Sequence, residues 1–172
     1  LGAWGSFKTD ISVAQMVSNS SGMVGLLDDP IYPPYVCQFL DSGTLQECGK
    51  KIYTADDAAD RITPDTKFRY GGGQWQLAGA VAEVVSGKSW AQLFEETYTL
   101  PCGLSASGFN SPFAKSIAQG AEKYPSWFDG DPASLAHTDN PSIEGGAYTT
   151  AADYAKVLLM HLRGGLCDGK RV

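Results

Sequence analysis

Residues 68–79 read Phe-Arg-Tyr-Gly-Gly-Gly-Gln-Trp-Gln-Leu-Ala-Gly, and this run is the most informative part of the chain. Tyr70 precedes three glycines, and a helical pattern of apolar residues follows them. Glycine lets the backbone turn sharply and approach a ligand closely, because it has no side chain. A helix placed directly after such a bend holds the bend in position. The pattern therefore predicts a phenol at the edge of a cleft. The plainer alternative is a packed aromatic residue at the entrance of a helix.

The rest of the chain indicates short helices joined by long loops. Apolar residues recur with helical spacing over residues 9–18, 44–53, 74–86, 90–97 and 150–163. Prolines and glycines in residues 25–43 predict an ordered loop, and the composition of residues 105–140 predicts a long irregular segment. We therefore expect a mainly α fold with long loops and little β structure.

Two of these helices carry a face that we expect to be buried. The first has apolar residues three and four positions apart, namely Trp75, Ala78, Val81, Ala82 and Val85. The last helix opens with the capping sequence Thr150-Ala151-Ala152-Asp153. Its expected inward residues are Tyr154, Val157, Leu158 and Leu162.

Composition excludes several classes of function. The 172 residues carry a net charge of −6, and none of the 13 lysines and arginines forms a basic run, so we expect no nucleic-acid partner. No apolar stretch approaches the roughly 20 residues that a membrane-spanning helix needs, so we expect no membrane partner. The first residues, Leu1-Gly2-Ala3-Trp4-Gly5, have no features of a signal peptide. We therefore expect the chain to begin after any export signal or within a longer protein.

The four cysteines allow three pairings. Cys37 and Cys48 flank a short polar loop. Cys102 precedes Gly103, and Cys167 lies two residues from Gly165 and Gly169, so both have a turn-like setting. We favour the disulfides Cys37–Cys48 and Cys102–Cys167, which would place the protein in an oxidising compartment, secreted or periplasmic. The alternative is four free thiols in a cytosolic protein. A zinc site is disfavoured because no Cys-x-x-Cys pair is present.

Four segments, in sequence order, resemble segments of the serine β-lactamase and D,D-peptidase superfamily, which also includes esterases. Residues 11–23 resemble the helix and Ser-Gly-apolar turn that follow the nucleophile helix in that family. Residues 63–72 resemble the lead into its Tyr-x-Asn motif, and residues 87–104 resemble its Thr-Gly-Lys-Ser helix. Residues 145–154 resemble its Gly-Gly-apolar-x-Ser-Thr-Ala-x-Asp segment.

The resemblance implies roles for particular residues. Tyr70 would be the catalytic residue that transfers a proton to and from a nucleophilic serine, and Gly71 and Gly72 would line the substrate site. Glu144 is a further candidate for that site on other grounds, because a turn at Gly145-Gly146 can bring its carboxyl near the cleft. Gly72 stands where the motif has asparagine, and it offers only backbone to a substrate amide. This favours an esterase or an unassigned serine hydrolase over a lactamase. The family's nucleophile lies in Ser-x-x-Lys. No serine here has lysine three positions later, and the family's C-terminal Lys-Thr-Gly strand motif is not reached either.

The resemblance also implies the organisation of the protein. Residues 1–172 would form a single helical region, the helical subdomain of a serine β-lactamase-like fold, without the N- and C-terminal parts that build the sheet. The parent would be a serine hydrolase acting on a small-molecule ester or amide. We expect the chain alone to be inactive and to have those missing segments as partners. We expect no cofactor. We also expect no metal, because acidic residues spaced like Asp56, Asp57 and Asp60 more often form a solvated helix face.

Two other functions stay open at this stage. The chain could be an inactive pseudo-enzyme, or a binding or scaffold domain of the same fold, if the parent protein has no Ser-x-x-Lys. It could also be a small independent carbohydrate- or protein-binding domain, which the aromatic content of 11% supports weakly.

Overall fold

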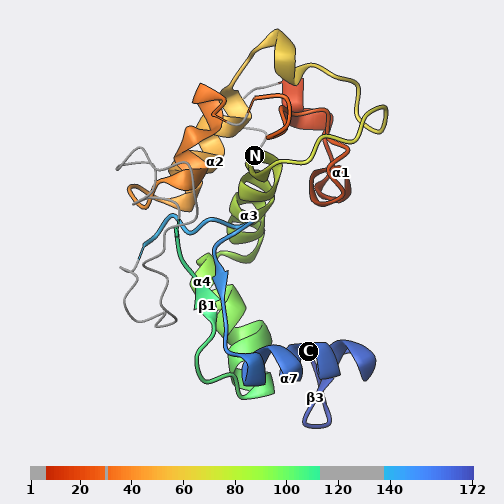
Figure 1. The fold of residues 1–172 in the computed structure, drawn as a ribbon, viewed down its shortest axis with the longest axis vertical. Helices are drawn as coiled ribbons and strands as arrows, with labels where there is room; N and C mark the ends of the chain where they lie inside the picture. Colours follow the sequence, from red (N-terminus) through yellow and green to blue (C-terminus); the bar gives the residue numbers. More distant parts are fainter. Residues whose placement is uncertain (1–6, 30, 113–137) are drawn as a thin grey trace.

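The computed structural model describes residues 7–29, 31–112 and 138–172. In chain order the elements are η1 (Phe7–Asp10), α1 (Val13–Val17), η2 (Pro33–Phe39), α2 (Leu45–Thr54), η3 (Ala58–Asp60), α3 (Gly72–Ser86), α4 (Trp90–Phe94), η4 (Glu95–Thr99), α5 (Leu100–Cys102), β1 (Gly108–Phe109), β2 (Ala147–Tyr148), α7 (Ala151–Leu162), β3 (Leu166–Cys167) and β4 (Lys170–Arg171). The molecule is elongated, with α1, α2 and α3 at one end and α7 at the other (Figure 1). The expectation of a mainly α fold with little β structure is confirmed.

The main core lies where α3 packs against α2, α1 and η2. Its most deeply buried apolar side chains are Met23, Ile52, Tyr53 and Leu77. A second cluster joins α5, α7 and β3 around Leu104 and Met160 at the far end of the molecule. The helices are short, so this burial rather than intrinsic helix propensity must hold them in place.

The predicted helix boundaries are set by side-chain caps. Ser12, Thr44 and Ser89 each accept a hydrogen bond from the backbone N–H three residues later, and in each case a glutamine or glutamate completes a capping box. Gly87 ends α3 in the left-handed conformation that glycine favours. The helix that Ser89 opens continues through η4, a π-helical turn, to Cys102, so it runs past the predicted end near Thr97.

The prediction of a loop over residues 25–43 is wrong in part, because η2 forms a 3-10 helix within it. Pro33 opens this helix, where the missing N–H of proline has no hydrogen bond to lose. The Cys37–Cys48 disulfide joins η2 to α2, and the Cys102–Cys167 disulfide joins α5 to β3, so both predicted pairings are confirmed.

The predicted buried face of α3 is wrong in part. Trp75, Ala78 and Val81 are partly buried and pack against apolar clusters, as predicted. Val85 is 81% exposed, whereas Gln74 and Gln76 are buried together with Leu77 and Ala80. Polar side chains occupy this inner face because each one completes hydrogen bonds to loops that cross the helix. The spacing of apolar residues could not predict this inner face, because glutamines in a helix are usually assigned to its solvent-exposed side.

The predicted inward face of α7 is also wrong in part. Val157 packs against the apolar cluster around Met160, as predicted. Tyr154, Leu158 and Leu162 are exposed, and the most buried side chains of the helix are Asp153 and Met160. The Asp153 carboxylate accepts hydrogen bonds from the backbone N–H groups of Ser105 and Ala106, both at 2.7 Å. These hydrogen bonds hold the pKa of the Asp153 carboxyl below its ordinary value, and the one from the Ala106 N–H has the largest effect. This residue therefore ties α7 to the segment that leads into β1.

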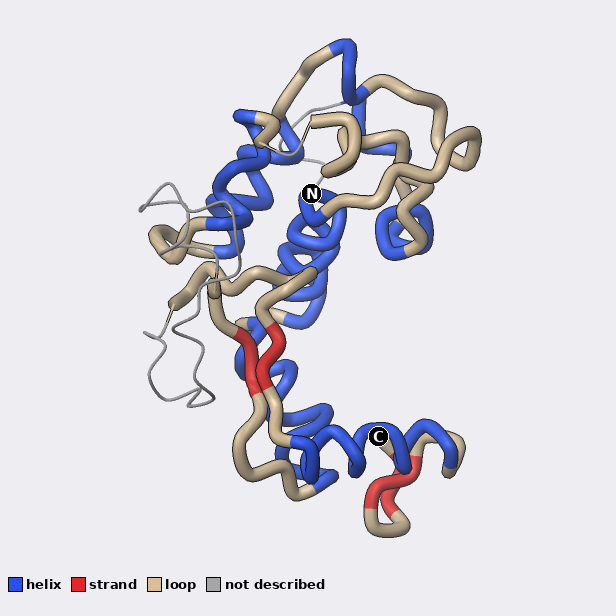
Figure 2. The backbone as a smooth tube through the Cα atoms, viewed as in Figure 1, coloured by secondary structure: helices blue, strands red, loops and turns tan. Residues whose placement is uncertain are grey.

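Two short antiparallel pairs are the β structure of the described residues, and Figure 2 shows both in red. β1 pairs with β2, with Phe109 opposite Ala147, and thereby joins segments nearly 40 residues apart in the chain. β3 and β4 form a hairpin beside α7. The predicted irregular segment 105–140 lies mostly outside the described residues. Within the described part of the chain, no helix is long and apolar enough to cross a bilayer.

Replacing Gly22 with alanine should lower the free energy of unfolding by about 2–5 kcal/mol. Gly22 has φ of +83°, and a Cβ atom there would lie less than 3.0 Å from the carbonyl oxygen of Ile62. A left-handed conformation costs an L-residue roughly 1–2 kcal/mol, and moving the Ile62 backbone adds a cost of about 1–3 kcal/mol, typical of overpacking. Urea unfolding of the two proteins measures the difference. Gly103→Ala is the control, because Gly103 also has positive φ but has open space around it. Equal losses in both variants would contradict the steric part of the argument.

Candidate functional site

Tyr70 lies in a bend that backbone hydrogen bonds fix on both sides. The Arg69 N–H donates to the Asn19 carbonyl at 2.8 Å, and the Leu26 N–H donates to the Tyr70 carbonyl at 2.7 Å. Both partners belong to the segment after α1, the segment that resembles a Ser-Gly-apolar turn. The bend is thus held against a second stretch of chain about 50 residues earlier in the sequence.

The Asn19 side chain is the centre of this arrangement. Its Oδ1 accepts hydrogen bonds from Gln74 Nε2 at 2.9 Å, from Trp75 Nε1 at 3.3 Å and from the Gly71 N–H at 3.4 Å. Gln74 Nε2 also donates to the Arg69 carbonyl at 2.7 Å. One amide oxygen therefore connects the first turn of α3 to the backbone around Tyr70.

Arg69 anchors the other side of the bend from a buried position. Its Nη1 donates to the carbonyls of Gly22 and Ala59 at 2.6 and 2.7 Å, and its Nε donates to Asp28 Oδ2 at 2.6 Å. The hydrogen bond from Arg69 holds the pKa of the Asp28 carboxyl below its usual range. Because Arg69 points inward, the next residue, Tyr70, points outward.

Tyr70 is 46% exposed, so its phenol reaches the surface rather than lying sealed in the core. This placement is compatible with the predicted proton-transfer role.

The three glycines after Tyr70 are sites of close approach. A Cβ atom on Gly71 would lie 2.9 Å from the Cα of Gly25, and one on Gly73 would lie 2.5 Å from the Tyr35 ring. A Cβ atom on Gly72 would lie less than 3.0 Å from both Gln38 Oε1 and Glu144 Oε2. Gly72 stands at the asparagine position of the Tyr-x-Asn motif. The space that an asparagine side chain would need is therefore occupied by two other side chains, Gln38 from η2 and Glu144 from the segment before β2.

Glu144 is brought to this place by the buried amide of Gln76. Gln76 Oε1 accepts from the Ile143 N–H at 3.0 Å, and its Nε2 donates to the Pro141 carbonyl and to Asn140 Oδ1, both at 2.9 Å. These three hydrogen bonds hold residues 140–143 along α3. Glu144 then follows directly, next to the N-terminal end of the helix.

Glu144 is half-buried and interacts with Tyr70. Burial raises the pKa of the Glu144 carboxyl, and a side-chain hydrogen bond from Tyr70 opposes that rise. The carboxyl oxygen Oε1 of Glu144 is buried and has no hydrogen-bond partner within the described part of the chain. A partly buried carboxyl group of this kind keeps its proton to a higher pH than an exposed one does.

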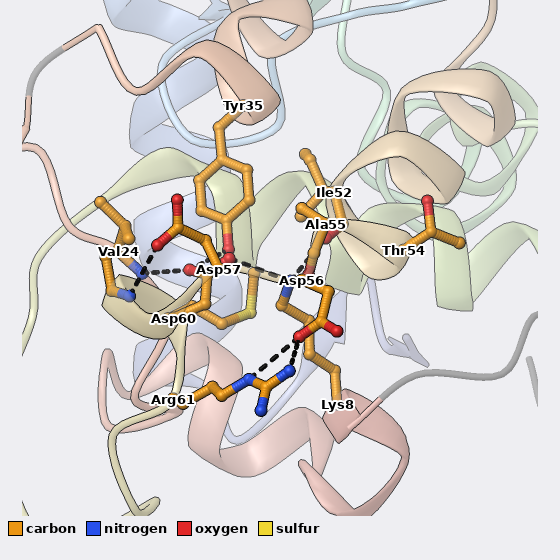
Figure 3. Close-up of polar contacts among 12 residues, drawn as sticks. Lys8, Val24, Tyr35, Ile52, Thr54, Ala55, Asp56, Asp57, Asp60 and Arg61 are labelled. Carbon is orange, nitrogen blue, oxygen red and sulfur yellow. Dashed lines mark hydrogen bonds and ion pairs between the residues drawn. The ribbon is translucent and has the colours of Figure 1, made fainter.

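A second polar cluster surrounds Asp60, and Figure 3 shows it. Lys8 Nζ lies 3.1 Å from Asp60 Oδ2 and donates to the carbonyls of Ile52 and Ala55 at 2.8 and 2.6 Å. Asp60 also accepts from the Tyr35 hydroxyl and, at 2.9 Å, from the Val24 N–H. The side chains of Lys8 and Asp60 are completely buried, so this cluster stabilises the fold rather than meeting a ligand.

The expectation that Asp56, Asp57 and Asp60 form a solvated face is therefore wrong for Asp60. It holds for the other two, which are exposed. Asp56 pairs with Arg61, and Asp57 accepts a hydrogen bond from the Ala59 N–H at the start of η3. Among the described residues, no group of three histidine, cysteine or acidic side chains is arranged to hold a metal ion.

A protein-family comparison decides the relationship. The model of the Beta-lactamase family matches residues 4–171, which is nearly the whole chain. The chain belongs to the β-lactamase family. The expected identification with the serine β-lactamase-like superfamily is confirmed, and the helices described above are the helical part of that fold.

Solved structures agree with this assignment to the β-lactamase family. A candidate β-lactamase from Bacteroides dorei DSM 17855 is 26% identical, with a TM-score of 0.68 over 99% of this chain and 42% of that one. A penicillin-binding protein from Bacillus halodurans is 19% identical, with a TM-score of 0.57 over 91% of this chain and 47% of that one. Simvastatin synthase (LovD) from Aspergillus terreus is 18% identical, with a TM-score of 0.51 over 89% of this chain and 39% of that one.

The chain spans less than half the length of each of these β-lactamase-like structures. At under 25% identity, the second and third show a shared fold only. Among curated proteins, no sequence match was found.

Sequence reasoning located Tyr70, Gly71, Gly72 and Glu144, and the structure brings all four together at the start of α3. It missed Gln38, which lies in a proline-rich stretch with no pattern to mark it. It also missed the Asn19 and Arg69 side chains that hold the bend. The family resemblance of residues 11–23 was the one signal that pointed to Asn19.

Proposed function

We propose that this chain is the helical part of a serine hydrolase that transfers acyl groups from small-molecule esters or amides. The observation that carries the proposal is the exposed phenol of Tyr70 on a rigid bend, in a chain of the β-lactamase family. The nucleophilic serine and its lysine would come from a Ser-x-x-Lys segment outside these 172 residues.

The chemistry follows from the acidity of the groups involved. A serine hydroxyl is a weak nucleophile until a neighbouring base takes its proton. A phenol with an ordinary pKa near 10 can serve as that base only when a cation stabilises its anion, and the lysine of the missing segment would supply the cation. Tyr70 would take the serine proton as the acyl-enzyme forms and pass it to the leaving group. In the second step it would take a proton from the water that attacks the acyl group and return that proton to the serine oxygen as the acyl–serine bond breaks.

Esters are the favoured substrates because no side-chain amide is present at position 72. Gln38 and Glu144 fill the space that such a side chain would need. Within the motif itself, only backbone groups could therefore hydrogen-bond to a substrate amide.

Several apolar side chains are exposed on this chain, which supports the proposal that other segments of a longer protein pack over them. Tyr154, Leu158 and Leu162 lie exposed on α7, and Leu27 and Phe68 are exposed near Tyr70. In a complete hydrolase the sheet-forming segments before and after this chain would cover part of this surface. The two disulfides support a secreted or periplasmic location.

The proposal is tested with a longer protein that includes the flanking segments, compared with residues 1–172 alone. Both are assayed with a short-chain p-nitrophenyl ester and with a chromogenic cephalosporin, and intact-mass spectrometry is used to detect an acylated serine. We expect acylation and faster ester than lactam hydrolysis by the longer protein, and no activity from residues 1–172. A longer protein that binds these compounds without acylation would favour the inactive, scaffold alternative.

A further inference from the structure

Asn19 makes hydrogen bonds to the backbone on both sides of Tyr70. Its carbonyl accepts from the Arg69 N–H at 2.8 Å, and its side-chain Oδ1 accepts from the Gly71 N–H at 3.4 Å. Asn19 is buried and has φ of +59°, a left-handed conformation that asparagine and glycine adopt more readily than other residues. One residue, distant in sequence, therefore holds both neighbours of the phenol-bearing residue.

We propose that Asn19 is a positioning residue for Tyr70, which holds the phenol in place for proton transfer by fixing the backbone before and after it. The proposal rests on the proposed function, because Tyr70 is taken there as the proton-transfer group. In this assignment Asn19 acts only through the backbone of residues 69–71.

The chemistry of the donors fixes the orientation of the Asn19 amide. The Trp75 indole N–H and the Gly71 N–H can only donate, so the side-chain atom 3.3 and 3.4 Å from them must be the amide oxygen. Gln74 Nε2 donates to the same oxygen at 2.9 Å. Three donors thus converge on one acceptor, and a residue without that acceptor would leave all three without this hydrogen bond.

The Gln74 side chain is fixed in turn, so Asn19 is joined to a well-anchored part of α3. Gln74 Oε1 accepts from the Ser21 hydroxyl at 2.6 Å, and Nε2 donates to the Arg69 carbonyl at 2.7 Å as well as to Asn19. Gln74 and Ser21 are both buried. A donor that loses its acceptor here cannot simply bond to bulk water instead, so the loss of the Asn19 amide should loosen the bend.

The first test is the kinetics of Asn19→Gly in the longer protein. Glycine adopts a left-handed conformation without strain, so this variant removes the amide and still permits the same backbone path. We expect kcat for ester hydrolysis to fall by about 10- to 100-fold, the effect of a misplaced catalytic group, with KM changed less than about twofold. Asp168→Gly is the matched control, because Asp168 also has positive φ, +47°, in the turn between β3 and β4. Its kcat should stay within about twofold of the parent.

A double variant separates positioning from a general loss of stability. In the Tyr70→Phe background, Asn19→Gly should have almost no further effect on kcat, because Asn19 acts only through Tyr70. A loss of kcat that remains in this background overturns the proposal, and so does an unchanged kcat in Asn19→Gly alone.

Ser21→Ala gives the same test in a milder form, should circular dichroism show that Asn19→Gly does not fold. It removes one hydroxyl from the buried network and leaves Asn19 in place. We expect kcat to fall by about 3- to 10-fold, as for the loss of one hydrogen bond, with KM unchanged. This loss should also disappear in the Tyr70→Phe background. A Ser21→Ala variant with the kcat of the parent overturns the proposal.

Amide hydrogen exchange observes the bend without any need for activity. The Leu26 N–H donates to the Tyr70 carbonyl, and the Arg69 N–H donates to the Asn19 carbonyl. In Asn19→Gly we expect these two amides to exchange at least about 10-fold faster, because the bend opens locally, while the amides of α7 keep their rates. Unchanged exchange at Leu26 and Arg69, or equal acceleration in α7, overturns the proposal. If the longer protein hydrolyses nothing, the proposed function fails, and the exchange rates still decide whether Asn19 holds the bend.

Discussion

Replacing Asp60 with alanine should lower the free energy of unfolding by about 3–5 kcal/mol, the typical cost of leaving a buried charge without its partner. Lys8 Nζ lies 3.1 Å from the Asp60 carboxylate, and both side chains are fully buried. Burial already lowers the pKa of Lys8, and the negative charge of Asp60 opposes this effect. Without the carboxylate, the ammonium group must either stay charged without a counter-ion or lose its proton. Both outcomes destabilise the folded state at neutral pH.

The loss extends beyond the ion pair, because Asp60 also accepts hydrogen bonds from the Tyr35 hydroxyl and the Val24 N–H. Val24 belongs to the segment that supports the Tyr70 bend. We therefore expect the variant to lose ester hydrolysis in the longer protein as well as stability.

The Asp60 prediction is measured by urea unfolding followed by tryptophan fluorescence. Asp56→Ala is the matched control, since Asp56 forms an exposed pair with Arg61 that should contribute about 0–1 kcal/mol. Adding Lys8→Met to Asp60→Ala should restore part of the lost stability, because it removes the unpaired charge. Similar losses for Asp60→Ala and Asp56→Ala would show that the Lys8–Asp60 pair is not the source of the effect.

Tyr70→Phe should lower kcat for ester hydrolysis by about 10²–10⁴-fold in the longer protein, the usual contribution of a positioned acid–base group. The change removes one oxygen atom from a side chain that is 46% exposed, so the fold should tolerate it. KM should change little, because the phenol acts in the transition state rather than in binding the ground state. Stopped-flow assays can separate formation of the acyl-enzyme from its breakdown, and both steps should be slowed.

Tyr154→Phe is the matched control for this measurement. Tyr154 is 54% exposed on α7 and undergoes the same chemical change away from the Tyr70 bend. Its kcat should stay within about twofold of the parent. A Tyr70→Phe variant that also stays in this range would remove Tyr70 from the mechanism and leave its hydroxyl a surface feature.

Much of the local structure could be predicted from the sequence because it depends on neighbouring residues. The caps at Ser12, Thr44 and Ser89 and the helix end at Gly87 follow from side chains within one turn of the feature they determine. The order of the family segments likewise needs only the linear sequence. It was enough to indicate the family and to single out Tyr70.

The buried faces could not be predicted because they depend on what crosses each helix. Gln74 and Gln76 are buried since Ser21 and the backbone of Ile143 supply their hydrogen-bond partners. Asp153 is buried for the same reason, with partners in the segment before β1. Periodicity ranks side chains by hydrophobicity alone, so it assigned these polar residues to the surface and placed Leu158 and Val85 inside.

The sequence by itself determined the helix caps, the order of the helices and the tyrosine–glycine bend, because each depends on residues close together or on a linear pattern. It left three disulfide pairings open, and the structure decided between them. Only the tertiary structure decided which side chains meet at that bend. Gln38, Gly72 and Glu144 converge there from three separate segments, and the buried Lys8–Asp60 pair joins two more. Contacts between distant segments depend on how the chain folds back on itself, and no local pattern of residues records that path.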